Sequence, residues 1–312
     1  MTITHPLPKS VKIVEVAPRD GLQNEQQHLT INDKVQFIKH LINAGLQHIE
    51  AGSFVSPRQV PQMASSPEVI QALPQLKQVS YSALVPNLKG FEKAKALGLK
   101  EIAVFTSASE SFCQANIHCT IKESLKRFQP VIEAAQQENI KVRAYISCVI
   151  ACPYQGKILA NTVTQLSKEL IERGCHEISL GDTTGVGTVA SVTHLLEDVL
   201  KAISVKQIAV HFHDTYGQAL ANIYAALQLG ISIIDSSVAG LGGCPFAKSA
   251  SGNVATEEVV YLLNGLGIKH NISLEKLLLA GQFISKSLNK KPPSKLAQAL
   301  INQNSQTKKC SE

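Results

Sequence analysis

Short runs of β-branched and apolar residues alternate along this chain with longer stretches in which apolar residues recur every three or four positions. The short runs are typical of buried strands, and the longer stretches predict amphipathic helices. The predicted strands are Val11–Ala17, His48–Ala51, Val79–Val85, Glu101–Phe105, Lys141–Cys148, Glu177–Gly181, Ile208–His213 and Ile233–Val238. The predicted helices include Thr30–Asn43, Asn87–Leu97, Ile121–Glu138, Asn161–Arg173, Val189–Ala202 and Gly217–Leu229.

A repeated junction supports this alternation. Before the second, fourth, sixth and eighth predicted strands, a helix ends at a glycine, which adopts the left-handed conformation that terminates helices. These residues are Gly45, Gly98, Gly174 and Gly230. Other helices begin at residues that favour N-caps, namely Thr30, Asn87 and Thr120.

Eight strand–helix units in succession predict a (β/α)8 TIM barrel rather than a doubly wound sheet. Because no Pro-, Gly- or Ser-rich linker divides the chain, residues 1–312 are expected to form a single catalytic barrel domain. A C-terminal helical extension is expected over about residues 254–302, followed by a polar tail over 303–312.

The composition is that of a soluble enzyme, with 44% hydrophobic and 17% charged residues. A net charge of +6 is too mild to predict a nucleic-acid partner. No run approaches the roughly 20 apolar residues of a membrane helix, so no membrane association is expected. The first ten residues lack the features of an export or transit signal, and the seven cysteines lack zinc spacing. Reduced thiols and a cytoplasmic location are therefore expected.

Polar residues collect where the predicted strands end. In a TIM barrel these ends share one rim, which carries the functional groups. Arg19, Asp20, Gln23, Glu50, Ser53, Tyr145, Ser147, Asp182, Thr183, His211 and His213 all fall at this rim, as does the segment 240–245. Arg19, Gln23, Ser53, Tyr145, Ser147 and Thr183 are candidates for binding a substrate.

The pair His211 and His213 indicates a metal site. Residues two apart on a strand point to the same face, so both imidazoles can converge on one point. Asp20 adds a carboxylate from the first strand, and Asn253 is a candidate for an amide oxygen ligand. This mixed set suits magnesium or manganese, although imidazoles also suit zinc.

An arginine, a cysteine and two acidic residues are further candidates for catalytic groups. Arg19, which is always charged, would hold a carbonyl oxygen that becomes an enolate. Cys244 lies in a glycine-rich segment that could close over a substrate, and its thiol can exchange a proton with a carbon centre. Glu50 and Asp182 are placed either to orient Arg19 or the metal ligands, or to act directly.

These residues lie in motifs that resemble the 3-hydroxy-3-methylglutaryl-CoA lyases, a family in the metal-dependent lyase and synthase group of TIM barrels. The resemblance runs from about Val11 to about Gly267. Its motifs are Arg19-Asp20-Gly21-Leu22-Gln23-Asn24-Glu25, Ser53-Phe54-Val55-Ser56-Pro57, Gly181-Asp182-Thr183-Thr184-Gly185, His211-Phe212-His213-Asp214-Thr215 and Gly240-Leu241-Gly242-Gly243-Cys244-Pro245. The last motif discriminates best, because related synthases lack this cysteine loop.

The resemblance implies cleavage of 3-hydroxy-3-methylglutaryl-CoA to acetyl-CoA and acetoacetate, as in leucine degradation. It implies a homodimer, a magnesium or manganese ion, and the ligands Asp20, His211, His213 and Asn253. Arg19 would stabilise the enolate, Cys244 would act as acid and base, and Glu50 and Asp182 would support catalysis. The base that takes the proton of the substrate hydroxyl would be Asp20 or His211.

Three alternatives remain at this stage. A related synthase would condense an acyl-CoA with a 2-oxo acid, and an aldolase of the same barrel group would act on free acids. A catalytically silent barrel would serve as a binding protein, although the intact set of polar residues argues against it.

Overall fold

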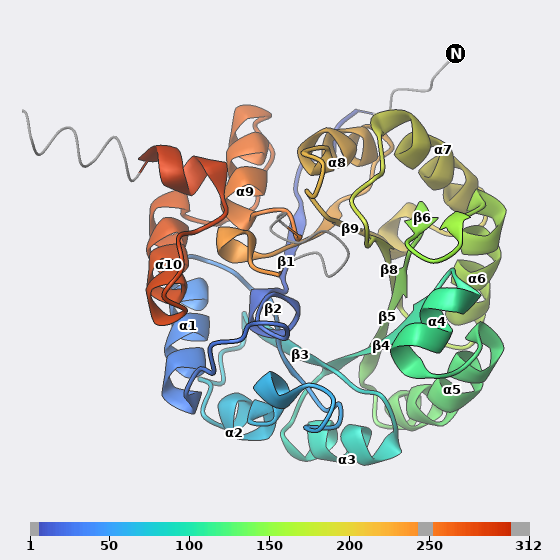
Figure 1. Cartoon of the computed structure of the whole chain (residues 1–312), viewed down its shortest axis with the longest axis horizontal. Helices are drawn as coiled ribbons and strands as arrows, with labels where there is room; N and C mark the ends of the chain where they lie inside the picture. The colour runs from blue at the N-terminus through green and yellow to red at the C-terminus, as the bar shows by residue number, and fades with distance from the viewer. Residues whose placement is uncertain (1–5, 243–251, 301–312) are drawn as a thin grey trace, which may run out of the picture.

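Eight parallel strands close into a barrel with helices around its outside in the computed structural model, which describes residues 6–242 and 252–300 (Figure 1). Neighbouring strands follow the order β1-β10-β9-β8-β5-β4-β3-β2 around the barrel. The strands are β1 (Lys12–Glu15), β2 (His48–Ser53), β3 (Ser80–Leu84), β4 (Glu101–Ser107), β5 (Lys141–Ser147), β8 (Glu177–Asp182), β9 (Ile208–Phe212) and β10 (Ile233–Ser236). The prediction of a TIM barrel with eight strands is confirmed.

The helices that connect these strands are those expected from the sequence, with two short additions. The expected ones are α1 (Ile31–Asn43), α3 (Leu88–Ala96), α5 (Ile121–Gln137), α6 (Ala160–Glu172), α7 (Val189–Leu200) and α8 (Ala219–Gln228). The additions are α2 (Ser66–Gln71) and α4 (Glu110–Ile117). With six and eight residues, both span only about two turns, too few for a periodic apolar pattern to stand out.

The predicted helix ends are confirmed by local geometry. The side chains of Thr30, Asn87 and Thr120 accept hydrogen bonds from backbone N–H groups in the first turns of α1, α3 and α5. The four junction glycines, Gly45, Gly98, Gly174 and Gly230, all have positive φ, between 75° and 111°. Local sequence alone therefore determines how these helices begin and end.

The first strand is shorter than predicted, because β1 ends at Glu15 and a π-helix follows from Ala17 to Gly21. In this turn the amide of Gly21 bonds the carbonyl of Val16, and that of Leu22 bonds the carbonyl of Ala17. The wider turn carries Arg19 and Asp20 over the barrel mouth instead of along a strand. Strand propensity cannot reveal such a turn, which is frequent at functional sites.

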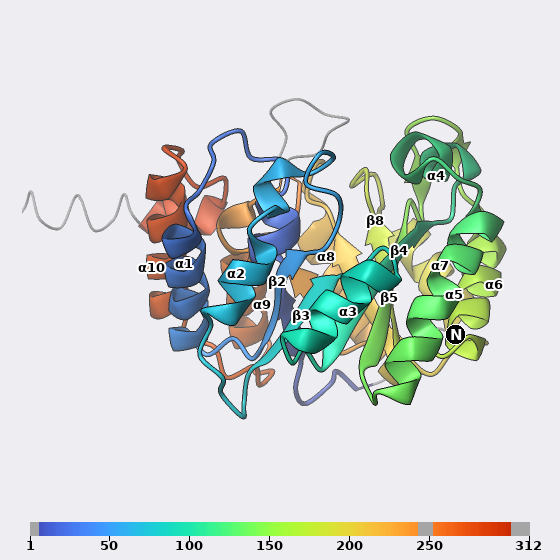
Figure 2. The ribbon, with the colours of Figure 1, turned by 90° about the horizontal axis from the view of Figure 1, so that it is seen from below.

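Two strands and the C-terminal helices lie outside the regular pattern. The short strands β6 (Ala151–Cys152) and β7 (Gly156–Lys157) form an antiparallel hairpin after β5. The helices α9 (Thr256–Gly265) and α10 (Leu274–Ser287) lie within the predicted extension, and α10 packs against α1 (Figures 1 and 2). The predicted polar tail at 303–312 lies outside the described residues.

The remaining elements are three 3-10 turns, and the main hydrophobic core joins the strands to the helices packed around them. The turns are Pro61–Met63, Val205–Gln207 and Val238–Gly240. Phe37, Phe91 and Phe212 are among the largest fully buried side chains. In the described part of the chain, no helix is long and apolar enough to cross a membrane. The five cysteines within that part are free thiols.

Glu15 is a fully buried carboxylate that joins three segments around the barrel mouth. Its Oε1 accepts the backbone N–H of Ala17 at 3.0 Å and that of Val238 at 2.9 Å. Its Oε2 accepts the hydroxyl of Thr256 at 2.8 Å. Burial raises the pKa of Glu15 to about 7, because removal from water disfavours the charged form.

This raised pKa makes stability depend on pH. A carboxyl whose pKa is higher in the folded state stabilises the protein below its unfolded pKa, and that contribution is lost as the pH rises through about 7. We therefore expect Glu15→Gln, which stays neutral, to gain roughly 1–3 kcal/mol of unfolding free energy relative to the unaltered protein between about pH 5 and pH 8. Denaturant unfolding across this range measures the difference. Glu197→Gln, at an exposed carboxylate of α7, should show no such trend; a pH-independent difference for Glu15→Gln would contradict the assignment.

Candidate active site at the barrel mouth

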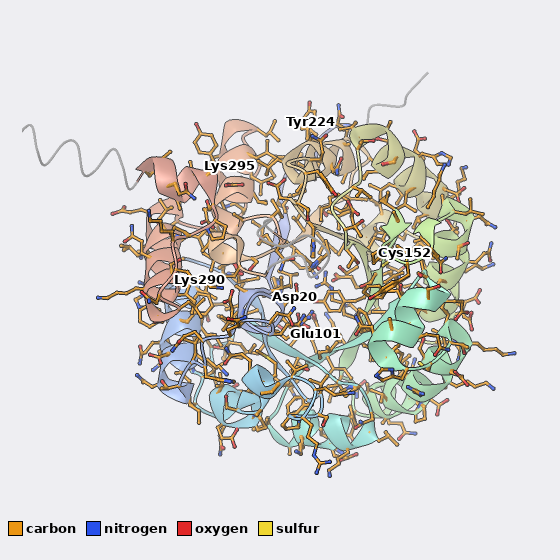
Figure 3. The ribbon with its side chains drawn as sticks, in the orientation of Figure 1. Asp20, Glu101, Cys152, Tyr224, Lys290 and Lys295 are labelled. Carbon is orange, nitrogen blue, oxygen red and sulfur yellow. The ribbon has the colours of Figure 1, made fainter. Side chains whose placement is uncertain are left out.

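Asp20, His211 and His213 come together at the carboxyl ends of β1 and β9. One ligand atom from each side chain lies within 4.8 Å of those of the other two. The Nε2 atom of His211 is 3.8 Å from Oδ2 of Asp20. Figure 3, viewed down the barrel, shows Asp20 near the centre of the ring of strands. The spatial cluster expected from the sequence is therefore present.

Asn253 lies against the same cluster because its backbone forms an isolated antiparallel bridge with His213. Its Nδ2 donates to Oδ2 of Asp20 at 2.8 Å and to the carbonyl of Leu241 at 3.1 Å. The amide nitrogen thus faces Asp20, and the amide would have to turn for its oxygen to reach a cation. Asn253 as a ligand stays a prediction.

The protonation states of the cluster fit a divalent cation. Burial and the neighbouring His211 lower the pKa of His213 to about 4, so its imidazole is neutral near pH 7. A bond to the backbone of Thr183 opposes this lowering only in part. Burial opposes ionisation of Asp20, but the charge of Arg19, the neighbouring histidines and the bond from Asn253 together outweigh it and lower the pKa of Asp20 to about 2. A carboxylate beside a neutral imidazole is the donor set that magnesium, manganese or zinc takes.

Arg19 is held beside this cluster by two carboxylates. Its Nε donates to Oε2 of Glu50 at 2.7 Å, and its Nη1 donates to Oδ1 of Asp20 at 2.6 Å. Although burial acts in the opposite direction, these charges raise the pKa of Arg19 further. Burial raises the pKa of Glu50, and the ion pair with Arg19 only partly offsets this. A fixed positive charge therefore lies next to the candidate cation site.

Tyr145 lies beneath Arg19 and is almost fully buried. The guanidinium carbons of Arg19 and Arg143 lie 5.2 and 5.1 Å from the centre of its ring. Its hydroxyl donates to Glu50 at 3.1 Å and accepts from Nη1 of Arg143 at 3.2 Å. The ring thus separates two cations while the hydroxyl links their networks. A direct contact of Tyr145 with substrate stays a prediction.

The other candidate residues occupy supporting positions. Gln23 donates to Oδ1 of Asp20 at 3.1 Å. The hydroxyl of Thr183 accepts the N–H of Cys148 at 2.9 Å, and the hydroxyl of Ser53 accepts that of Val55 at 3.3 Å. Ser147 is half-buried at the end of β5, where its carbonyl accepts the hydroxyl of Ser107 at 3.1 Å.

Asp182 bonds the backbone of the turn that follows β8 and forms no ion pair with Arg19. Its Oδ2 accepts the N–H of Gly187 at 2.7 Å. Burial raises the pKa of Asp182, and the amides of this turn counteract that rise only in part. Its position suits it to hold the turn that carries Thr183 at the rim.

The thiol of Cys244 lies outside the described residues, but the start of its segment is described. Gly242 has φ of 103°, and a Cβ atom there would lie 2.6 Å from Nδ2 of Asn253. Only glycine therefore allows the chain to pass so close to the cluster.

Arg143, a polar residue of the fifth predicted strand, was assigned no role from the sequence, and Asp235 was missed entirely. Arg143 and Asp235 are buried inside the barrel and pair at 2.5 Å through Nη2 and Oδ1. Burial raises the pKa of Asp235, but Arg143 and His211, through their charge and their hydrogen bonds, together overcome this and lower the pKa to about 2. The signal that could have found them is a charged residue within an apolar strand, on the same face as known rim residues.

Comparison with known proteins agrees with this geometry. The HMGL-like family model matches residues 10–284. A Pseudomonas aeruginosa protein named 3-hydroxy-3-isohexenylglutaryl-CoA/hydroxy-methylglutaryl-CoA lyase is 55% identical over 95% of this chain and 98% of its own. A Rattus norvegicus protein named 3-hydroxy-3-methylglutaryl-CoA lyase, cytoplasmic, is 55% identical over 94% of this chain and 85% of its own. A crystal structure of hydroxymethylglutaryl-CoA lyase from Pseudomonas aeruginosa superposes with a TM-score of 0.93 at 55% identity, covering 95% of this chain and 99% of its own.

The position of Tyr145 generates a prediction about stability. Tyr145→Phe leaves Nη1 of Arg143 without its acceptor in a buried site, so we expect a loss of about 1–3 kcal/mol in unfolding free energy. Denaturant unfolding measures this loss. Tyr261→Phe, at an exposed position of α9, should change stability by less than about 0.5 kcal/mol. Equal stabilities for the two variants would show that the hydroxyl does not hold the network together.

Proposed function

The chain belongs to the HMGL-like family, and we propose that its Asp20–His211–His213 cluster is the centre at which it cleaves a carbon–carbon bond. The chain is a lyase that converts 3-hydroxy-3-methylglutaryl-CoA to acetyl-CoA and acetoacetate, the chemistry of leucine degradation. The observation that supports this location for the reaction is the convergence of the three side chains beside the ion-paired Arg19.

Asp20, His211 and His213 would hold a divalent cation, magnesium or manganese, with Asn253 as a fourth ligand once its amide has turned. When bound, the cation supplies a Lewis acid that acidifies the tertiary hydroxyl of the substrate. The half-buried Asp20 and the two buried histidines leave little water around this point. Electrostatic interactions within the cluster are stronger for that reason.

Arg19 is proposed to bind the thioester oxygen, where negative charge develops as the bond breaks. Its Nε and Nη1 are taken by Glu50 and Asp20, so the guanidinium is already oriented before substrate arrives. A preoriented cation stabilises an enolate without reorganisation during the reaction. Glu50 thus acts by positioning Arg19, and Asp182 by positioning the turn that follows β8.

Two side chains are candidates for taking the proton of the hydroxyl, Asp20 and His211. Asp20 already accepts hydrogen bonds from Arg19, Gln23 and Asn253. Nε2 of His211 lies 3.8 Å from Oδ2 of Asp20. Cys244 is proposed to protonate the carbanion, which the entry of its segment beside Asn253 supports. The products would then leave as acetoacetate and acetyl-CoA.

The names of the relatives bear on the cellular location and the substrate class of the enzyme. The name of the rat protein supports the proposal that this chain works in the cytoplasm. An acyl-CoA is the substrate class, and a homodimer stays a prediction.

A direct assay tests the function. The purified protein should release acetoacetate from 3-hydroxy-3-methylglutaryl-CoA when magnesium or manganese is present. A chelator should abolish this activity, and added cation should restore it, because Asp20 and the histidines cannot act alone as a Lewis acid. Asp20→Asn should require more cation for half-maximal activity.

The same assay separates the alternatives. Equal activity on free 3-hydroxy-3-methylglutarate would favour an aldolase that does not need the CoA group. Condensation of acetyl-CoA with a 2-oxo acid, without cleavage, would favour a synthase. Full activity in the presence of chelator would overturn the proposed cation site.

The role of Arg19 yields a separate prediction. Arg19→Gln should lower kcat roughly 10²–10³-fold, the usual effect of removing one oxyanion donor, without weakening cation affinity. Steady-state kinetics and manganese titration measure the two quantities. Arg127→Gln, at an exposed arginine of α5, is the matched control. An unchanged kcat for Arg19→Gln would remove Arg19 from the reaction.

A further inference from the structure

The two histidines of the cluster differ in what holds their second ring nitrogen. Nδ1 of His211 is 3.2 Å from Oδ2 of Asp235, a carboxylate on the neighbouring strand β10. The side chain of His213 instead bonds the backbone of Thr183, and among the described residues no carboxylate bonds its buried Nδ1. One imidazole is therefore tied to a buried carboxylate, and its neighbour is not.

The barrel itself sets the contact between His211 and Asp235. The two residues are direct partners in the register between β9 and β10. Ser179 lies on β8, the strand that pairs with β9 on the side opposite β10. Its hydroxyl donates to Oδ2 of Asp235 at 2.7 Å. The position of Asp235 thus depends on strand pairing and not on a loop.

Arg143 keeps Asp235 in its charged form and its fixed orientation. Its Nη2 donates to Oδ1 of Asp235 at 2.5 Å, and its Nε lies 2.8 Å from Oε1 of Glu177. Glu177 also contacts Lys12 at the opposite end of the barrel interior. Both oxygens of Asp235 are therefore committed, one to Arg143 and the other to Ser179 and His211.

An ionised carboxylate only accepts hydrogen bonds. Its contact with Nδ1 consequently requires the proton of a neutral His211 to reside on Nδ1. The lone pair of His211 then belongs to Nε2, the nitrogen that faces Asp20. Such outer carboxylates commonly fix the tautomer and the ring orientation of a metal-binding histidine.

We propose that Asp235 is the positioning residue of this site, which fixes His211 with Nδ1 protonated and Nε2 directed at the cation. Asp235 does not touch the substrate and acts only through His211. This inference rests on the proposed cation site and assigns one residue outside it a specific task.

The variant Asp235→Asn tests this task. Its amide oxygen would remain with the positive charge of Arg143, so its NH2 group would face Nδ1 of His211. That arrangement favours the tautomer with the proton on Nε2, which removes the lone pair from the cluster. We expect manganese affinity to fall 10–100-fold, the usual effect of losing such a partner. Titration calorimetry of the substrate-free protein measures this affinity.

Glu177→Gln is the matched control. It makes the same carboxylate-to-amide change in the same buried network and against the same arginine, but Glu177 does not contact His211. A purely structural effect should appear in both variants, whereas the proposed effect should leave the affinity of Glu177→Gln within about threefold of the unaltered protein. Equal losses in the two variants, or an unchanged affinity for Asp235→Asn, would overturn the proposal.

Nitrogen NMR of histidine-labelled protein gives a readout that needs neither activity nor a folded Asp235→Asn variant. The signals of His211, assigned by comparison with His211→Gln, should show Nδ1 protonated in the unaltered protein. A proton on Nε2 with none on Nδ1 in the metal-free protein would refute the inference even if Asp235→Asn failed to fold. Failure of the unaltered protein to bind manganese would instead refute the cation site on which the inference rests.

Discussion

The buried ion pair between Arg143 and Asp235 is the interaction on which the site depends. A guanidinium in the centre of a barrel is costly unless charges and hydrogen bonds replace the lost water. Asp235, Glu177 and the hydroxyl of Tyr145 supply these partners. This pair is therefore stable only when the surrounding strands are in register. The same register fixes the positions of the catalytic residues at the barrel mouth.

From this pair, contacts run in two directions toward the reacting groups. One passes through Tyr145 and Glu50 to Arg19, and the other passes through Asp235 to His211. The two meet again where Asp20 contacts Arg19 and approaches His211. A closed ring of this kind limits how far any one member can move. Preorganisation of this sort is the main physical means by which enzymes stabilise developing charge.

The sequence predicted those parts of the fold that depend on local patterns. The eight strands and the helix-ending glycines, such as Gly45 and Gly174, follow from apolar periodicity and backbone preference. The π-helix at Ala17–Gly21 could not be predicted from such patterns, because Glu15 stabilises it through bonds to distant segments. Asp235 was also missed: its role depends on the register between β9 and β10, which no local pattern encodes.

In the candidate site, too, a local sequence motif predicted some features, whereas others depend on contacts between distant segments. The motif around His211 and His213 predicted which side chains converge, since strand alternation places both on one face. It could not predict that Asp235 and Asp20 give the two imidazoles different surroundings. Glu15 accepts the N–H of Ala17, which begins the segment of Arg19, and the N–H of Val238, which begins the segment of Gly242. It also accepts the hydroxyl of Thr256, shortly after Asn253. Three segments distant in sequence thus share one carboxylate. Because these contacts involve mainly backbone amides, they would tolerate many changes in neighbouring side chains while keeping the mouth of the barrel in place.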